Sequence, residues 1–86
     1  MKVHPSDFVG KPKRIYFVEG EYVFRVEISS IDNGNVYYRN SEQARKSKDP
    51  EKSFNWYPVI GSFVPGEVEF FDSAKAAVNA EKSEAA

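Results

Sequence analysis

The sequence contains no cysteine and no long apolar run, and each absence removes a class of protein. Without thiols the chain forms no disulfide, has no thiolate nucleophile and offers no cysteine-ligated zinc site. A membrane-spanning helix needs about 20 consecutive apolar residues, far more than any uncharged stretch of this chain supplies. Residues 1–10 also lack the apolar core of a secretion signal. We therefore expect a protein without a membrane segment, located in the reducing cytoplasm.

Groups that perform catalysis are scarce as well. His4 is the only histidine, and it lies in an N-terminal segment where we expect no fixed geometry for a general base. Glu67 and Glu69 share one face of an expected strand, but no spaced set of oxygen ligands accompanies them. The five glycines are scattered at turns, so no phosphate-binding loop is formed. We predict neither an enzyme nor a site for a metal or cofactor.

Length and composition indicate a small globular unit. The chain has 86 residues, which is enough for one domain spanning residues 1–86. Aromatic residues make up 15% of the sequence and supply the large apolar area that a small core needs. The net charge is −1, but residues 1–48 carry nine basic minus six acidic residues (+3) and residues 49–86 carry three minus seven (−4). The overall basic excess that is typical of nucleic-acid-binding chains is absent.

Two N-terminal segments, residues 13–19 and 21–28, alternate between apolar and polar side chains, which is the period of a β-strand. With residues 19–20 as a two-residue turn, Phe17 pairs with Tyr22. The apolar side chains of both strands then fall on one face, because directly opposed residues share a face. We predict a β-hairpin with one apolar side.

The next turn, at residues 32–34, is expected to be a three-residue loop rather than a two-residue Asn-Gly turn. That choice pairs Ile28 with Tyr38 and Glu27 with Arg39. Apolar side chains then face the core, and opposite charges meet on the outside. A third strand therefore follows this loop.

The middle of the chain is harder to assign. Residues 40–53 are almost wholly polar, and we expect a long loop that begins with a short helical turn capped by Ser41. Residues 54–60 predict a fourth strand, which lies at a sheet edge or carries a bulge because Pro58 has no backbone N–H to donate. Residues 67–71 alternate again and predict a last strand.

The C-terminal segment is rich in alanine, and we expect a helix from Ala74 onward, capped by Asp72 or Ser73. Its apolar stripe is thin, so residues 80–86 should fray, and residues 1–10 should form a mostly irregular lead-in. The predicted fold class is mainly β (α+β). It is a small antiparallel curled sheet, or a barrel of SH3-like shape, with a short C-terminal helix.

One face of the predicted N-terminal sheet combines arginine with tyrosine. These residue types are frequent hot spots of protein interfaces, and they also stack on bases and contact phosphates. Alternatively, the arginine stems simply cover the tyrosines, and Glu27 neutralises Arg39. If the C-terminal helix folds over this face, its tyrosines belong to the core. The residues of this face are Arg14, Tyr16, Val23, Arg25, Tyr37 and Arg39.

Two further candidates lie outside that face. The expected loop carries the basic residues Arg45, Lys46 and Lys48, which are diluted by acidic neighbours and could steer an acidic partner. Trp56 is the only tryptophan, and a lone tryptophan in a strand is more often core than site. At a sheet edge, however, Trp56 would lie where a partner strand can add.

These observations predict a non-enzymatic module that binds another protein as a regulator, adaptor or inhibitor. The alternative is binding of single-stranded nucleic acid through the arginine–tyrosine face, which the net charge of −1 disfavours. An enzyme that uses only carboxylates is a third reading, and the Glu67–Glu69 pair is its only support.

Overall fold

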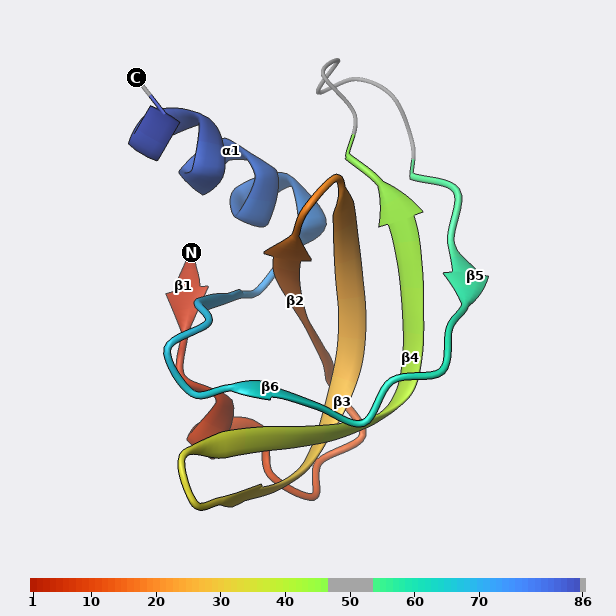
Figure 1. The fold of residues 1–86 in the computed structure, drawn as a ribbon, viewed down its shortest axis with the longest axis vertical. Coiled ribbons are helices and arrows are strands. Elements are labelled where there is room, and N and C mark those ends of the chain that lie inside the picture. Colours follow the sequence, from red (N-terminus) through yellow and green to blue (C-terminus); the bar gives the residue numbers. More distant parts are fainter. Residues whose placement is uncertain (47–53, 86) are drawn as a thin grey trace.

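The computed structural model describes residues 1–46 and 54–85, which form a curled antiparallel sheet and one C-terminal helix (Figure 1). Seven strands of this part of the chain pair in the order β1-β7-β2-β3-β4-β5, and β6 pairs with β4. The mainly β prediction is confirmed in its curled-sheet form, because the sheet does not close into a barrel. The elements are β1 (Lys2–Val3), η1 (Pro5–Phe8, a 3-10 helix), β2 (Arg14–Glu19), β3 (Tyr22–Asp32), β4 (Asn35–Arg45), β5 (Tyr57–Pro58), β6 (Phe63–Pro65), β7 (Phe70–Phe71) and α1 (Ala74–Ala85).

The hairpin of β2 and β3 forms where the alternation predicted it, but its turn lies one residue later. Glu19 pairs with Tyr22, and Phe17 pairs with Phe24, so the predicted pairing of Phe17 with Tyr22 is wrong. The loop begins with Gly20, whose φ of 62° suits a turn with glycine in its first central position. A register shift of two residues keeps every side chain on its own face, so the predicted apolar face is correct although the predicted pairing is not.

The turn between β3 and β4 is a two-residue loop at residues 33–34, whose φ angles of 50° and 77° are both positive. The predicted three-residue loop is therefore wrong. The predicted pairs of Ile28 with Tyr38 and of Glu27 with Arg39 are nevertheless confirmed. A β-bulge next to Ile28 adds one residue to β3 and returns the apolar side chains to the core face.

The polar segment that follows is a strand, not a loop, because β4 continues to Arg45. A second bulge lies near Asn40, whose φ is 50°. Ser41 does not cap a helical turn; its buried hydroxyl donates to the carbonyl oxygen of Val59 at 2.7 Å. Ala44 is fully buried, so this half of β4 contributes to the core although most of its residues are polar.

The later strands are shorter than their patterns predicted. Within residues 54–60 only Tyr57–Pro58 forms a strand, and within residues 67–71 only Phe70–Phe71 does. β5 pairs with β4 on one side and ends the sheet order, so the predicted edge position of Pro58 is confirmed.

Each end of the chain packs against the sheet. In the N-terminal segment, expected to be irregular, β1 pairs with β7, and Phe8 of η1 packs against the core. The Oγ of Ser73 accepts a hydrogen bond from the backbone N–H of Ala76 at 3.1 Å, which confirms Ser73 as a helix cap. α1 runs to Ala85, and no helix of the described residues is long and apolar enough to cross a bilayer.

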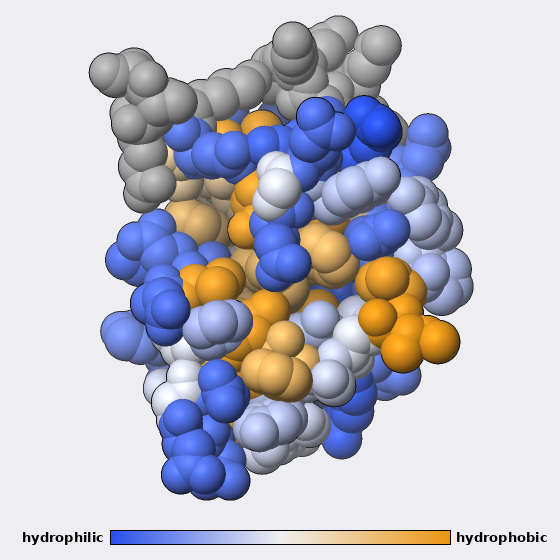
Figure 2. All heavy atoms as spheres, viewed as in Figure 1, coloured by the Kyte–Doolittle hydropathy of each residue, from blue (hydrophilic) through white to orange (hydrophobic). Residues whose placement is uncertain are grey.

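The sheet buries apolar side chains on both of its faces. The first cluster lies on the face that the alternation predicted. The second lies on the opposite face, where α1 covers one end of the sheet and buries Val23 completely. Figure 2 shows apolar residues in orange near the middle of the viewed surface, with hydrophilic residues around them. The first cluster consists of Ile15, Phe17, Val26, Ile28, Val36, Val64 and Phe70, and the second of Val23, Ala44, Phe71, Ala74, Ala77 and Val78.

Candidate functional site

The predicted site residues gather most closely around Trp56, on the sheet face that α1 covers only in part. Tyr16 of β2 and Arg25 of β3 are direct cross-strand partners. The Tyr16 ring lies 5.9 Å from the Trp56 ring, and Cζ of Arg25 lies 4.5 Å from the centroid of the Trp56 ring. The ring of Phe54 lies 5.7 Å from that of Trp56. We call the following residues the Trp56 cluster: Arg14, Tyr16, Arg25, Glu42, Phe54 and Trp56.

Glu42 connects the two arginines of the Trp56 cluster. Its Oε1 accepts a hydrogen bond from Nε of Arg25 at 2.9 Å and one from Nη1 of Arg14 at 2.5 Å. The hydrogen bond from Arg25 is the main cause that lowers the pKa of Glu42, and partial desolvation opposes it. The carboxylate therefore stays ionised at neutral pH, and the Arg25 guanidinium is held between this carboxylate and the indole ring.

Tyr37 and Arg39 of the predicted face lie farther along the sheet, toward the β3–β4 turn. The ring of Tyr37 is 5.6 Å from that of Phe63, and the Phe63 side chain is exposed to solvent. Nε of Arg39 donates to Oε1 of Glu27 at 3.4 Å. The predicted arginine–tyrosine face is therefore divided into the Trp56 cluster and a separate Tyr37–Phe63 pair. Val23, which was expected on the same face, is core.

The predicted basic loop does not form a common surface in the described residues. Arg45 belongs to β4, where it lies 5.8 Å from the ring of Tyr22 and 3.5 Å from a carboxylate oxygen of Glu21. Nζ of Lys46 donates to Oε1 of Glu81 on α1 at 2.6 Å. Lys48 lies outside the described residues. Loop membership of Arg45 is thus wrong, because β4 extends further than its polar composition indicated.

All four arginines of the chain bond to a carboxylate. Three carboxylates therefore offset most of the charge of the four guanidinium groups, and one positive charge remains where Arg14 and Arg25 share Glu42. A phosphate group that bound here would have to compete with those carboxylates. The pairs are Arg14 and Arg25 with Glu42, Arg39 with Glu27, and Arg45 with Glu21.

One member of the Trp56 cluster, Glu42, was missed in the sequence. Glu42 was assigned to the polar loop, although Glu42 and Ala44 share one face of β4 and follow the strand period. Phe54 was grouped with Trp56 and Tyr57 as a candidate in the sequence. Its proximity to Trp56 comes from the path of the chain before β5 and has no local signal.

His4 and the acidic residues were the remaining candidates for catalysis or metal binding. His4 is exposed at the start of η1. Within residues 1–46 and 54–85, no three histidine or acidic side chains come together in a way that could hold a metal ion. Comparison of the chain with protein-family models, curated proteins and solved structures found no match.

Proposed function

We propose that the chain is a non-catalytic module that binds another protein through the Trp56 cluster and acts as a regulator, adaptor or inhibitor. The observation that carries this proposal is the fixed position of Arg25 between Glu42 and the partly exposed ring of Trp56. Tryptophan, tyrosine and arginine dominate the binding energy of protein interfaces. Side chains that are already fixed lose less conformational entropy when they bind. We also propose a cytoplasmic location, because the cysteine-free chain needs no oxidising compartment.

The pairing of the arginines favours a protein over a nucleic acid as partner. Binding of single-stranded nucleic acid requires cationic side chains that can contact phosphates. In the Trp56 cluster Glu42 occupies both Arg14 and Arg25, and its lowered pKa keeps it ionised. The net charge of −1 adds no long-range attraction for a polyanion. Nucleic acid is therefore the second candidate, to be separated by the same experiment.

The test compares the protein with two variants of similar chemistry. Immobilised wild type, Trp56→Ala and Phe63→Ala are each incubated with a lysate of the source cells. We expect a protein that wild type and Phe63→Ala retain and Trp56→Ala loses. Phe63 is the matched control because it is an exposed aromatic residue outside the Trp56 cluster.

An NMR titration with a mixed-sequence single-stranded oligonucleotide tests the alternative. Amide shifts at Tyr16 and Arg25 that appear at low salt and vanish at moderate salt would favour nucleic acid, because phosphate contacts release counterions. The protein-binding proposal fails if those shifts appear and no protein is retained through Trp56.

A further inference from the structure

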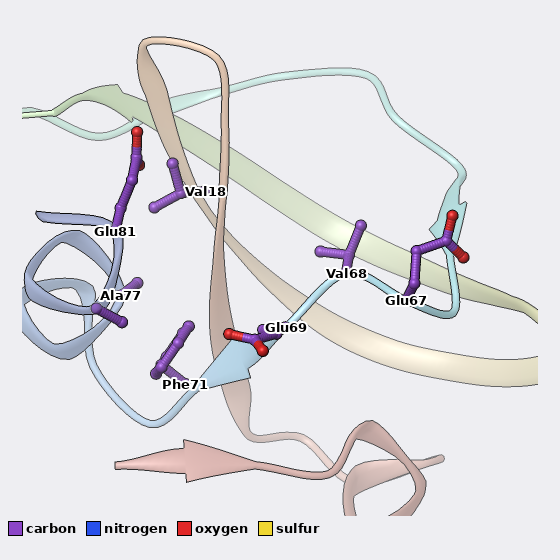
Figure 3. A pocket seen from close by; sticks show the side chains of 8 residues that line it. Val18, Glu67, Val68, Glu69, Phe71, Ala77 and Glu81 are labelled. Carbon is purple, nitrogen blue, oxygen red and sulfur yellow. The ribbon is translucent and has the colours of Figure 1, made fainter. Parts of the chain in front are cut away.

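A second concave site lies away from the Trp56 cluster, between α1, the edge of β2 and the segment that leads into β7 (Figure 3). Its volume is about 380 Å³, within the range of ligand-binding pockets. Among the described residues its lining has an apolar part and an acidic part. The apolar part consists of Val18, Val68, Phe71, Ala77 and Ala80, and the acidic part of Glu67, Glu69 and Glu81.

The fold itself leaves this space open. β2 and β7 are joined by a single bridge, between Tyr16 and Phe71, so β7 does not cover the edge of β2 near Val18. α1 faces this gap with Ala77 and Ala80, whose methyl side chains are too small to fill it. The pocket therefore has an apolar floor beside an incompletely paired strand.

Two of the three glutamates lie at the rim of the pocket. Figure 3 shows the Glu69 carboxylate near the ring of Phe71 and the Glu81 side chain beside Val18, whereas Glu67 points away. Oε1 of Glu81 accepts from Nζ of Lys46 at 2.6 Å. Its Oε2 is buried and has no hydrogen-bond partner among the described residues.

Glu69 is engaged less firmly. Its Oε1 accepts a hydrogen bond from Nζ of Lys2 at 3.0 Å, and both side chains of this pair are largely exposed. Exposed lysine–carboxylate pairs contribute little to stability and exchange easily. Glu81 is held more firmly, because its Oε1 is bonded to Lys46 and its Oε2 is buried, out of reach of a donor from solvent. The carboxylate of Glu69 can therefore exchange Lys2 for a new cationic donor.

We propose that this pocket receives a basic side chain, lysine or arginine, of the protein partner. The aliphatic stem lies against Val18 and Phe71, and the cationic head reaches the carboxylate of Glu69, as long basic side chains do at mixed surfaces. An acidic side chain would be repelled, and an apolar one would desolvate the carboxylates without replacing their hydrogen bonds. This inference rests on the proposed function, because it assigns a contact to the same partner.

The pocket is tested without the partner, by amide-resolved NMR titration with n-pentylammonium chloride. The control ligand is 1-pentanol, which has the same stem and no charge, at matched ionic strength. We expect saturable shifts at Val18, Phe71 and Ala77, and about fivefold or more tighter binding of the ammonium ion than of the alcohol. Equal affinity of the two ligands would overturn the inference.

Variants separate the charge from the cavity. Glu69→Gln should weaken pentylammonium binding about threefold or more, whereas Glu27→Gln, which removes a carboxylate bonded to Arg39 elsewhere, should leave it unchanged. Ala80→Leu fills the pocket, keeps every carboxylate and retains a good helix former, so it should abolish the shifts. Binding that persists in Ala80→Leu would show that the ion associates with surface charge only, and would overturn the inference.

The same variants distinguish this inference from the proposed function. In the lysate experiment we expect Ala80→Leu to lose the retained protein and Glu27→Gln to keep it. A protein that Trp56→Ala loses but Ala80→Leu retains would refute the pocket and leave the proposed function standing. Binding of pentylammonium without any retained protein would refute the proposed function, and the pocket would remain as a cation site of the isolated chain.

Discussion

The contact between Arg25 and Trp56 gives a quantitative prediction. Cζ of Arg25 lies 4.5 Å from the centroid of the Trp56 ring, and the Arg25 side chain is 24% exposed. Cation–π contacts contribute about 0.5–1 kcal/mol at exposed sites and about 2 kcal/mol when they are desolvated. Since Arg25 is partly shielded from water, we expect a coupling free energy of about 1 kcal/mol between the two side chains.

A double-mutant cycle measures this coupling. Wild type, Arg25→Met, Trp56→Leu and the double variant are unfolded in urea and followed by circular dichroism, which does not depend on the tryptophan. The loss of the bond from Arg25 to Glu42 occurs in both variants that lack Arg25, so it cancels from the coupling term.

The matched control is the pair Arg45 and Tyr22, in which Cζ lies 5.8 Å from the ring centroid. The Arg45 side chain is 73% exposed, so the same cycle should give a coupling below about 0.5 kcal/mol. If the coupling free energy of Arg25 and Trp56 is no larger than that of Arg45 and Tyr22, the indole ring does not hold the guanidinium in place.

Three further predictions concern the core, a close backbone approach and the carboxylate of the Trp56 cluster. Phe17→Ala should lower the free energy of unfolding by about 3–5 kcal/mol, because the ring is buried among other aromatic rings. Phe63→Ala, at an exposed position, should lower it by less than about 1 kcal/mol. Urea unfolding measures both changes in this free energy. Gly66→Ala should lower it by about 1–3 kcal/mol, because its Cβ would lie 2.6 Å from the carbonyl oxygen of Gly34, and an unchanged melting temperature would contradict this. Because folding lowers the pKa of Glu42 from its usual value of 4.5, the ionised carboxylate stabilises the fold at pH values above 4.5. The difference in free energy of unfolding between wild type and Glu42→Gln should therefore be largest at pH 7 and diminish as the pH falls through the lowered pKa. A difference that stays constant from pH 7 down to pH 2 would show that the pKa of Glu42 is not lowered.

The strand period identified those parts of the sheet in which one face is apolar. It located β2, β3 and the first half of β4, and local chemistry located the edge at Pro58 and the helix cap at Ser73. It missed the second half of β4, because Ala44 is the one apolar side chain there and Glu42 on the same face forms ion pairs. Such a face becomes recognisable only when its arginine partners on β2 and β3 are known.

Turn length illustrates a different limit of the sequence pattern. A three-residue loop at residues 32–34 and a two-residue loop followed by a bulge place Ile28 and Tyr38 on the same face. The hydrophobic pattern depends only on the face on which each side chain lies, so it cannot distinguish the two loop arrangements.

The candidate site could likewise be predicted only in part from the sequence. Tyr16 and Arg25 follow from the register of one hairpin, whereas Trp56 reaches them through a segment with no local signal.

The charge asymmetry of the sequence has a structural consequence for the two proposed contacts. Basic groups of the first half of the chain meet acidic groups of the second half through flexible lysines and the N-terminus. The arginines, in contrast, bond to carboxylates of their own half of the chain. A partner's cation can therefore displace a lysine at the rim of the pocket, while the arginines of the Trp56 cluster keep their carboxylate and act by shape and stacking. The pairs that cross between the two halves are Met1 with Asp72, Lys2 with Glu69 and Lys46 with Glu81.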